Sequence, residues 1–328
     1  ITDDDLIRIL EAVRDSTLRL HHVSLPNNFI GDAGVTALSW LLKGHSISHL
    51  DLHGNNIGPK GCQMLCDTLA NDTFLRHLDL SWNPLSREGG LQIAEMLRAN
   101  VTLESLQLRK TQMTEAGVIA ILATLRCENT TVRELHIGGQ PLVSRQEVVA
   151  HHVSQMLVSN GHLVSLGLAG CRIGDDGAML LKDALVNHPS MRHLNLAGNS
   201  IGIAGGECLA YLLLAQQELE TLDLSANSLG NDGAKAFKPV LEANTTLKSL
   251  DLRSNSVEDE GLSLLAEGLE GNATLQSLKI WGNTFGQQSL QAFAQLQEGR
   301  FALVGIYLDI RPYIVDDTWM VAQEAPPA

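Results

Sequence analysis

One spacing pattern recurs along the chain and constrains its fold more than any other feature. It reads L-x-x-L-x-L-x-x-N-x-I with a Gly four residues further on, as in Ile47, Leu50, Leu52, Asn55, Ile57 and Gly61. Its second apolar position falls at residues 23, 50, 78, 106, 135, 166, 194, 222, 250 and 278, mostly 28 residues apart. Repeats of this length bury their apolar faces by stacking on one another. We therefore predict ten repeats in one elongated domain, although 328 residues would by length alone suggest two domains of about 150 residues.

Each repeat combines two periodicities. The first half alternates apolar and polar residues, as in TLDLS at 221–225, and predicts a short strand. The second half has helical spacing, as in Ala234, Phe237 and Leu241 within the stretch 232–243. Helices are about 10 Å wide, whereas neighbouring strands are about 4.8 Å apart, so stacked repeats should curve. The predicted fold class is α/β: a right-handed solenoid with a parallel sheet on its concave face and helices on its convex face.

The pattern resembles the leucine-rich repeats of the ribonuclease-inhibitor class, over residues 18–298. The same class occurs in NOD-like receptors, in the Ran GTPase-activating protein and in stand-alone scaffold proteins. The resemblance implies a horseshoe-shaped leucine-rich-repeat solenoid, and it leaves the partner open because members share the scaffold and differ in what they bind. The ribonuclease inhibitor itself is a poor match, because its family is rich in cysteine and this chain has five.

Polar residues at fixed repeat positions have predicted structural roles. The Asn of the motif should bond backbone groups of the neighbouring coil. Repeats four to six replace it with Thr111, Gln140 and Cys171, either as tolerated substitutions or as a local change of curvature where a partner docks. Acidic residues such as Asp32 and Asp259 should cap the helices that they begin. Five Asn-x-Thr sequences fall at the helix-to-strand turn, where Asn is expected in the left-handed conformation: Asn71, Asn100, Asn129, Asn244 and Asn272.

The two ends depart from the repeat and should cover it. Residues 1–17 predict a helical cap or half repeat, and residues 299–328 predict a C-terminal cap with a frayed tail. Within the latter, 301–310 and 318–323 are expected to form a β-hairpin around 311–317. The N-terminal helix would fit either a cap or truncation from a longer protein.

Exposed strand positions supply the candidate binding residues. Tryptophan and basic residues, which are common at protein interfaces, occur in two groups: Trp281 with Arg253 and Lys279, and Trp82 with Arg109 and Lys110. The same predicted face carries Asp51, Asp79, Asp223, Asp251, His49 and His77. Gly138, Gly139, Gly167, Ala169 and Gly170 suggest a bare stripe that a partner's backbone could approach.

His22, His49 and His77 should stack on adjacent strands beside Asp51 and Asp79, an arrangement that could hold a metal or sense pH. The preferred interpretation is that they are ordinary polar residues of a solvated sheet, so we expect no metal site, no catalytic residue and no cofactor.

Composition narrows the class of partner and compartment. The net charge of −14 and the lack of a run of Lys or Arg argue against nucleic acid and against an anionic membrane. Five scattered cysteines without a CxxC indicate a reducing, intracellular setting, and we expect the cytoplasm. No apolar stretch is long enough to span a membrane, and 1–10 lacks the features of a secretory signal.

The expected function is a non-catalytic interaction scaffold that binds a protein or peptide partner on the concave face. Two alternatives stay open. One is the ligand-sensing or autoinhibitory region of a NOD-like receptor. The other is a Ran-type GTPase activator, for which Arg87 is the candidate arginine, although the loops are short and the tail EAPPA lacks the acidic run of that family.

Overall fold

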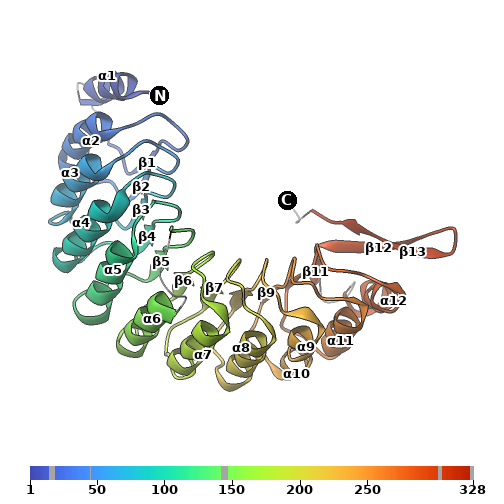
Figure 1. Ribbon diagram of the computed structural model, residues 1–328. Helices are drawn as coiled ribbons and strands as arrows, with labels where there is room; N and C mark the ends of the chain where they lie inside the picture. Colours follow the sequence, from blue (N-terminus) through green and yellow to red (C-terminus); the bar gives the residue numbers. More distant parts are fainter. Residues whose placement is uncertain (15–18, 45, 142–146, 302–304, 326–328) are drawn as a thin grey trace. The chain divides into compact units, whose positions relative to one another are not determined.

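A computed structural model describes residues 1–14, 19–44, 46–141, 147–301 and 305–325. They form two compact units, Ile1–Leu168 and Ala169–Ala328. Figure 1 shows the order of the helices and strands in each unit.

The first unit alternates helices with three-residue strands. Its elements are α1 (Asp3–Arg14), β1 (His22–Ser24), α2 (Asp32–Gly44), β2 (His49–Asp51), α3 (Pro59–Leu69), β3 (His77–Asp79), α4 (Ser86–Ala99), β4 (Ser105–Gln107), α5 (Glu115–Cys127), β5 (Glu134–His136), α6 (Glu147–Ser159) and β6 (Ser165–Gly167). The six strands pair in parallel in sequence order, without slippage, so that equivalent repeat positions lie directly opposite one another.

The second unit continues the alternation. Its repeat elements are α7 (Gly174–Leu185), β7 (His193–Asn195), α8 (Ile203–Ala215), β8 (Thr221–Asp223), α9 (Gly230–Lys235), α10 (Lys238–Ala243), β9 (Ser249–Asp251), α11 (Asp259–Leu269), β10 (Ser277–Lys279) and α12 (Gln287–Leu296). The single helix predicted over 232–243 is divided into α9 and α10, because Pro239 lies in the first turn of α10 and has no N–H to continue the helical hydrogen bonds. The π-helical turn η1 (Gln297–Phe301) follows α12.

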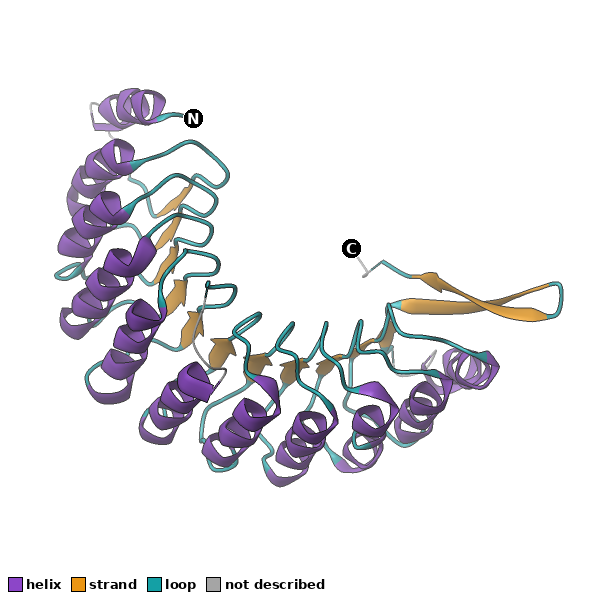
Figure 2. Cartoon of the chain, in the orientation of Figure 1, coloured by secondary structure: helices purple, strands orange, loops and turns teal. Residues whose placement is uncertain are grey.

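Alternation of apolar and polar residues explains why strands and helices face each other. Leu50 and Leu52 are buried, whereas His49 and Asp51 on the opposite face of the strand are only half-buried. Leu65 of α3 is also fully buried. In each unit the strands lie on one side and the helices on the other (Figure 2), which confirms the predicted α/β repeat fold. The exposed side of each sheet is called the strand face below.

The motif asparagines bond across coils as predicted. Asn83 is 1% exposed; its Oδ1 accepts the N–H of Ile57 at 3.0 Å, and its Nδ2 donates to the carbonyls of Leu52 and Leu80 at 2.9 and 3.0 Å. Gln140 makes the corresponding bonds, with Oε1 accepting the N–H of Met113 at 3.0 Å. At Gln140 the replacement therefore keeps the cross-coil bonding, which supports the interpretation of a tolerated substitution there, whereas the hydroxyl of Thr111 donates to the carbonyl of Leu108 in its own coil at 3.0 Å.

The acidic residues at the helix starts accept backbone N–H groups as predicted, but these belong to the next helix and not to their own. Asp32 begins α2, yet its Oδ1 accepts the N–H groups of Gly58 and Gly61 at 2.8 and 2.9 Å, at the start of α3 in the next coil. Asp175 likewise accepts from Gly202 and Gly205 at the start of α8. Stacking places the helix starts side by side, so the carboxylate at the start of one helix accepts hydrogen bonds from the free N–H groups of the next helix.

The Asn-x-Thr residues do not adopt the predicted left-handed backbone. Asn100 and Asn244 have φ of −75° and −76°. Both are buried, and Nδ2 of Asn100 donates to the carbonyl of Leu69 at 2.7 Å while its Oδ1 accepts the N–H of Leu103 at 2.8 Å. Asn100, Asn129, Asn244 and Asn272 thus make a second set of cross-coil hydrogen bonds at the helix-to-strand end of their repeats, whereas Asn71 is exposed.

The C-terminal segment differs from the predicted hairpin. β11 (Tyr307–Leu308) pairs in parallel with β10 as a further strand of the repeat sheet. The antiparallel hairpin consists of β12 (Ile310–Val315) and β13 (Thr318–Gln323). Its turn is Asp316–Asp317, at φ of 48° and 59°, values typical of a two-residue hairpin turn. The segment predicted as the hairpin loop therefore supplies its first strand, because an Asp pair satisfies the positive φ that such a turn needs.

Candidate functional site

The strand face of the first unit brings the predicted histidines and aspartates together. The ring centroids of His22 and His49 lie 4.1 Å apart, and those of His49 and His77 lie 4.2 Å apart with nearly parallel planes. Burial, and the charges of His77 and His22, lower the pKa of His49. The stack is therefore disfavoured when its rings become protonated together.

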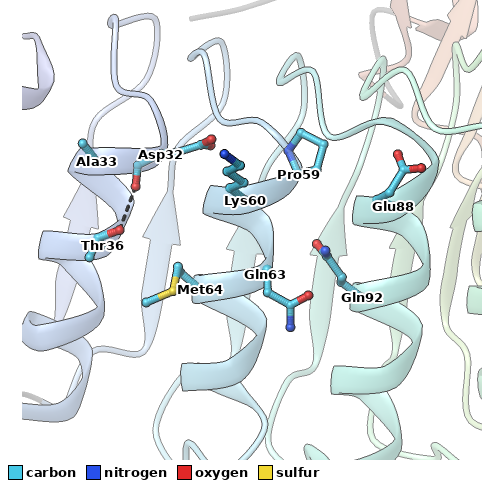
Figure 3. Close-up of a pocket in the computed structure, with 9 residues that line it drawn as sticks. All are labelled: Asp32, Ala33, Thr36, Pro59, Lys60, Gln63, Met64, Glu88 and Gln92. Carbon is cyan, nitrogen blue, oxygen red and sulfur yellow. Dashed lines mark hydrogen bonds between the residues drawn. The ribbon is translucent and has the colours of Figure 1, made fainter.

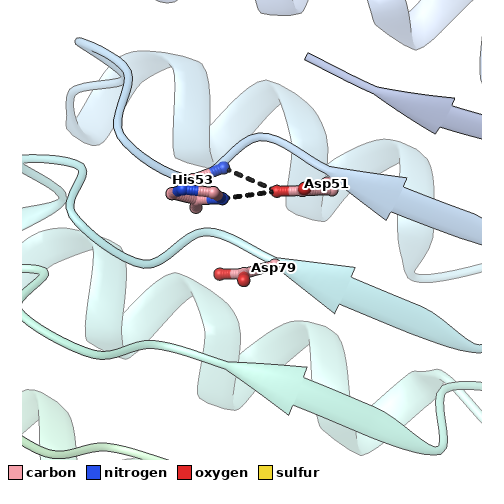
Figure 4. Close-up of side chains that lie close together, drawn as sticks. All are labelled: Asp51, His53 and Asp79. Atoms are coloured by element: carbon pink, nitrogen blue, oxygen red, sulfur yellow. Dashed lines mark hydrogen bonds and ion pairs between the residues drawn. The ribbon is translucent and has the colours of Figure 1, made fainter. Parts of the chain in front are cut away.

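Asp51 and Asp79 lie opposite each other on β2 and β3. Oδ1 of Asp51 accepts the backbone N–H of His53 at 3.0 Å and lies 3.1 Å from its Nδ1 (Figure 4). A ligand atom of Asp51, one of His53 and one of Asp79 all lie within 4.8 Å of one another. The three stacked histidines are not part of this group, and the sequence interpretation did not include His53 as a candidate ligand.

Trp82, Arg109 and Lys110 also meet, in the loops that follow β3 and β4. The backbone N–H of Trp82 donates to the carbonyl of Arg109 at 2.7 Å, and the Nζ of Lys110 lies 3.8 Å from the centroid of the Trp82 ring. Trp82 is 56% exposed and has φ of +58°, and Lys110 has φ of +52°. The equivalent position is also left-handed in other repeats, as at Gly54, Ala226 and Ser254, so this backbone conformation belongs to the repeat turn rather than to a particular site.

The predicted bare stripe of glycines is covered by side chains. A Cβ at Gly139 would lie 2.7 Å from Cγ of Lys110, and a Cβ at Gly167 would lie 2.3 Å from Nδ1 of His136. These glycines leave room for long side chains of the preceding coil. The expectation that a partner's backbone could lie directly against this stripe is therefore wrong at these two positions.

In the second unit, much of the predicted charge is bonded internally. Nε of Arg253 donates to both carboxylate oxygens of Asp251, at 2.9 and 3.0 Å, and its Nη2 donates to Oδ2 at 2.6 Å. This hydrogen bonding raises the pKa of Arg253 above its ordinary value. Asp251 is 5% exposed, so a partner meets it only through Arg253. Asp223 is half-buried and accepts hydrogen bonds from Asn195 and from Ser225.

Lys279 and Trp281 lie near the C-terminal strands. Trp281 follows β10, is half-buried rather than exposed on a strand, and donates its backbone N–H to the carboxylate of Asp309 at 3.2 Å. Lys279 and Arg253 line a cavity of about 410 Å³, whose other walls are Tyr307, Asp309, Gln323, Glu324 and Ala325. The hydroxyl of Tyr307 donates to the carbonyl of Glu324 at 2.9 Å, which holds Glu324 at the rim of the cavity. The sequence interpretation missed this contribution because it treated the segment after the hairpin as frayed.

A second cavity lies on the helix side of the first unit, and none of the predicted binding residues lines it. It has a volume of about 640 Å³ and is lined by residues of α2, α3 and α4: Asp32, Ala33, Thr36, Pro59, Lys60, Gln63, Met64, Glu88 and Gln92 (Figure 3). Oε1 of Gln92 is buried there without a hydrogen-bond partner among the described residues. The carboxylate of Asp32 is already used by the start of α3.

Comparison with known proteins agrees with the repeat geometry. The family model described as "Leucine Rich repeat" matches residues 45–66, 71–94, 99–122, 159–182, 187–210, 216–238 and 243–266, which together make up half of the chain. The chain belongs to the leucine-rich repeat family. The search of curated proteins found no match.

Two solved structures illustrate the likeness. Leiomodin-1 actin-binding site 2 is 19% identical at a TM-score of 0.38, with 55% of this chain and 87% of that chain covered. An internalin from Listeria monocytogenes, inlF, is 15% identical at a TM-score of 0.43, with 93% of this chain and 94% of that chain covered. With TM-scores under 0.5 and identities this low, neither structure supports a statement about the fold or the partner of this chain. Within the described ranges, no helix combines the length and apolarity needed to cross a bilayer.

Proposed function

We propose that this chain is a non-catalytic scaffold that binds a protein or peptide partner on the strand face of its repeats. The observation that carries the proposal is the Trp82–Lys110 pair. An exposed indole with a lysine on its ring, both on left-handed backbone, exposes apolar and cationic surface that adds little to the packing of the core. Aromatic and arginine side chains dominate binding energies at protein interfaces, and Arg109 lies beside this pair.

The proposal assigns the second unit a different contribution. Arg253 and Lys279 line the 410 Å³ cavity together with Asp309 and Glu324, so it offers polar groups of both signs, and Asp251 holds the guanidinium of Arg253 in a fixed orientation. A pre-oriented side chain loses less conformational entropy on binding than a mobile one. Trp281 is half-buried, so we assign it a supporting role rather than that of a central anchor.

Three finer assignments belong to the same proposal. The 28-residue interval, with a helix in each repeat, supports the ribonuclease-inhibitor class of leucine-rich repeats. The odd number and scatter of the cysteines support a reducing, intracellular setting. Non-catalytic action is supported by the way the strand-face carboxylates bond to their own coil, as Asp79 does to the N–H of Ser81 at 2.8 Å.

The test compares partner capture by matched variants. Trp82→Gly combined with Lys110→Ala removes the exposed pair, and glycine suits the left-handed backbone, as Gly54 and Gly139 show at the equivalent position. The control is Lys182→Ala with Tyr211→Ala, a lysine–aromatic pair on the helix side of the second unit. The measured quantity is the amount of protein that the chain captures and that cross-links to its strand face. It should fall at least about tenfold with the first double variant and stay unchanged with the second. Equal capture by all three proteins would contradict the proposal.

A further inference from the structure

Two strand-face carboxylates of the first unit lie opposite each other without a strong counter-charge. Asp51 and Asp79 are register partners on β2 and β3. In the described part of the chain, neither carboxylate has a Lys or Arg within ion-pair distance, and the imidazole of His53 is the ion-pair partner of Asp51. Like charges directly opposite on neighbouring strands are unfavourable. A cation between them would remove that cost.

The ligand atoms already have metal-like spacing. Oδ1 of Asp51 and Nδ1 of His53 are 3.1 Å apart, close to the roughly 3.4 Å that separates two ligands about 2.1 Å from a tetrahedral Zn²⁺. Oδ1 of Asp79 accepts the N–H of Ser81, whereas its Oδ2 has no hydrogen-bond partner among the described residues. That oxygen is available as a third ligand.

The second unit supplies an internal comparison. Asp223 and Asp251 repeat the opposed pair, and Arg253 stands two residues after Asp251 just as His53 stands two residues after Asp51. There the guanidinium itself neutralises the carboxylate through three hydrogen bonds. In the first unit His53 takes the place that Arg253 has in the second, and its imidazole is a common metal ligand.

We propose that Asp51, His53 and Asp79 bind a divalent transition-metal ion of the Zn²⁺ type on the strand face of the first unit. One nitrogen and two carboxylate oxygens suit Zn²⁺ or Co²⁺. Side-chain exposures of 34% for His53 and 35% for Asp51 leave the remaining coordination positions open to water. Nδ2 of Asn27 donates to Nε2 of His53 at 3.2 Å, and in this arrangement Nδ1 carries the ring proton and donates it to Asp51. A metal bound at Nδ1 moves that proton to Nε2, where the oxygen of the turned Asn27 amide would accept it, as second-shell groups do at metal sites.

The test is a titration of the full, untagged chain with Co²⁺, followed by d–d absorption and by competition with Zn²⁺. One saturable equivalent is expected. His53→Gln and Asp79→Asn should each weaken binding by at least about tenfold, because loss of a second-shell group alone costs 10- to 100-fold. Asn at position 79 still offers an oxygen to the N–H of Ser81, so the coil keeps that bond, and far-UV circular dichroism checks the fold.

Two control variants separate this site from others. Asp223→Asn changes a strand-face carboxylate of the second unit, and His49→Gln interrupts the histidine stack; both should bind Co²⁺ like the wild type. Absence of saturable binding would overturn the proposal, as would binding that survives both ligand substitutions. Loss of binding in His49→Gln, or a thiolate charge-transfer band, would assign the metal to the histidine stack or to a cysteine and would equally overturn it.

Discussion

The carboxylate of Asp259, in the first turn of α11, accepts the backbone N–H of Ser289 at the start of α12, at 2.8 Å. The same carboxylate accepts the N–H groups of Gly286 and Gln288 at 3.1 and 3.2 Å. Burial acts to raise the pKa of Asp259, but the hydrogen bonds from Ser289, Gln288 and Gly286 outweigh it and hold the pKa below its ordinary value. One side chain thus ties two consecutive repeats together at their helix starts.

Asp259→Ala should therefore lower the free energy of unfolding by about 1–3 kcal/mol, because three N–H groups lose their acceptor. Since the folded-state pKa is lowered, the stabilisation by Asp259 is present above the unfolded value of about 3.8 and is lost as the pH falls through the folded value. Urea unfolding of the wild type at neutral and acidic pH should show this loss, and Asp259→Asn should show less of it. Glu260→Gln, an exposed neighbour on the same helix, is the control. An Asp259→Ala protein as stable as this control would contradict the capping role.

The histidine stack predicts that the stability of the first unit depends on pH. The pKa of His49 is lowered by burial and by the charges of His77 and His22, so the unfolded chain takes up a proton more readily than the folded one. The stability that neutral His49 contributes is then fully present above the histidine pKa of the unfolded chain, about 6.5, and falls as the pH drops below that value. Asp51 and Asp79, two residues further along the same strands, and the hydroxyl of Ser48, 2.9 Å from Nδ1 of His49, are the other groups on this side.

The measurement is the free energy of unfolding at about pH 7.5 and about pH 5.5. His49→Gln should reduce the difference between the two values. His193→Gln, at the equivalent position of the second unit where the neighbour is Thr221 rather than a histidine, should leave the difference as in the wild type. The same reduction in both variants would mean that stacking is not the cause.

Asp309 ends the hydrogen-bond ladder of the second unit with its side chain. In the preceding coil the N–H of Leu252 donates to the carbonyl of Lys279, whereas the N–H of Ile280 donates to Oδ1 of Asp309 at 2.7 Å. The carboxyl is 3% exposed, and burial raises its pKa. Asp309→Ala should lower the free energy of unfolding by about 1–3 kcal/mol, because the N–H groups of Ile280 and Trp281 lose a buried acceptor.

The pH dependence of Asp309 has the opposite sign to that of Asp259. With the folded-state pKa raised, its favourable contribution is complete below the unfolded value of about 3.8 and declines as the pH rises through the folded value. Asp309→Asn keeps an oxygen for Ile280 and carries no charge, so at neutral pH it should cost less than Asp309→Ala. Asp317→Asn, in the exposed hairpin turn, is the control. If the Asn and Ala variants lost equal stability, the acceptor role would be wrong.

Much of the candidate site follows from the repeat phase alone. Because Asp51 and Asp79 occupy the same position of consecutive repeats, a parallel pairing without slippage must place them opposite each other, as it does for His49 and His77. The meeting of Trp82 with Lys110 follows from the same phase, because these residues are also 28 residues apart, and only their backbone conformation was harder to predict. Both residues leave the strand on left-handed backbone, and a pattern of apolar spacing carries no information about φ.

The sequence by itself determined the unit of the fold. Leu50, Leu52 and their equivalents recur with the spacing of a strand followed by a helix, and burial of such a face requires neighbouring copies. Only the tertiary structure decided which polar groups meet. Asp32 caps α3 rather than its own helix, and Asp309 replaces a backbone carbonyl of the repeat ladder. The physical reason is that a hydrogen bond depends on the direction and separation of two atoms, and stacking sets both between residues a whole repeat apart in the chain.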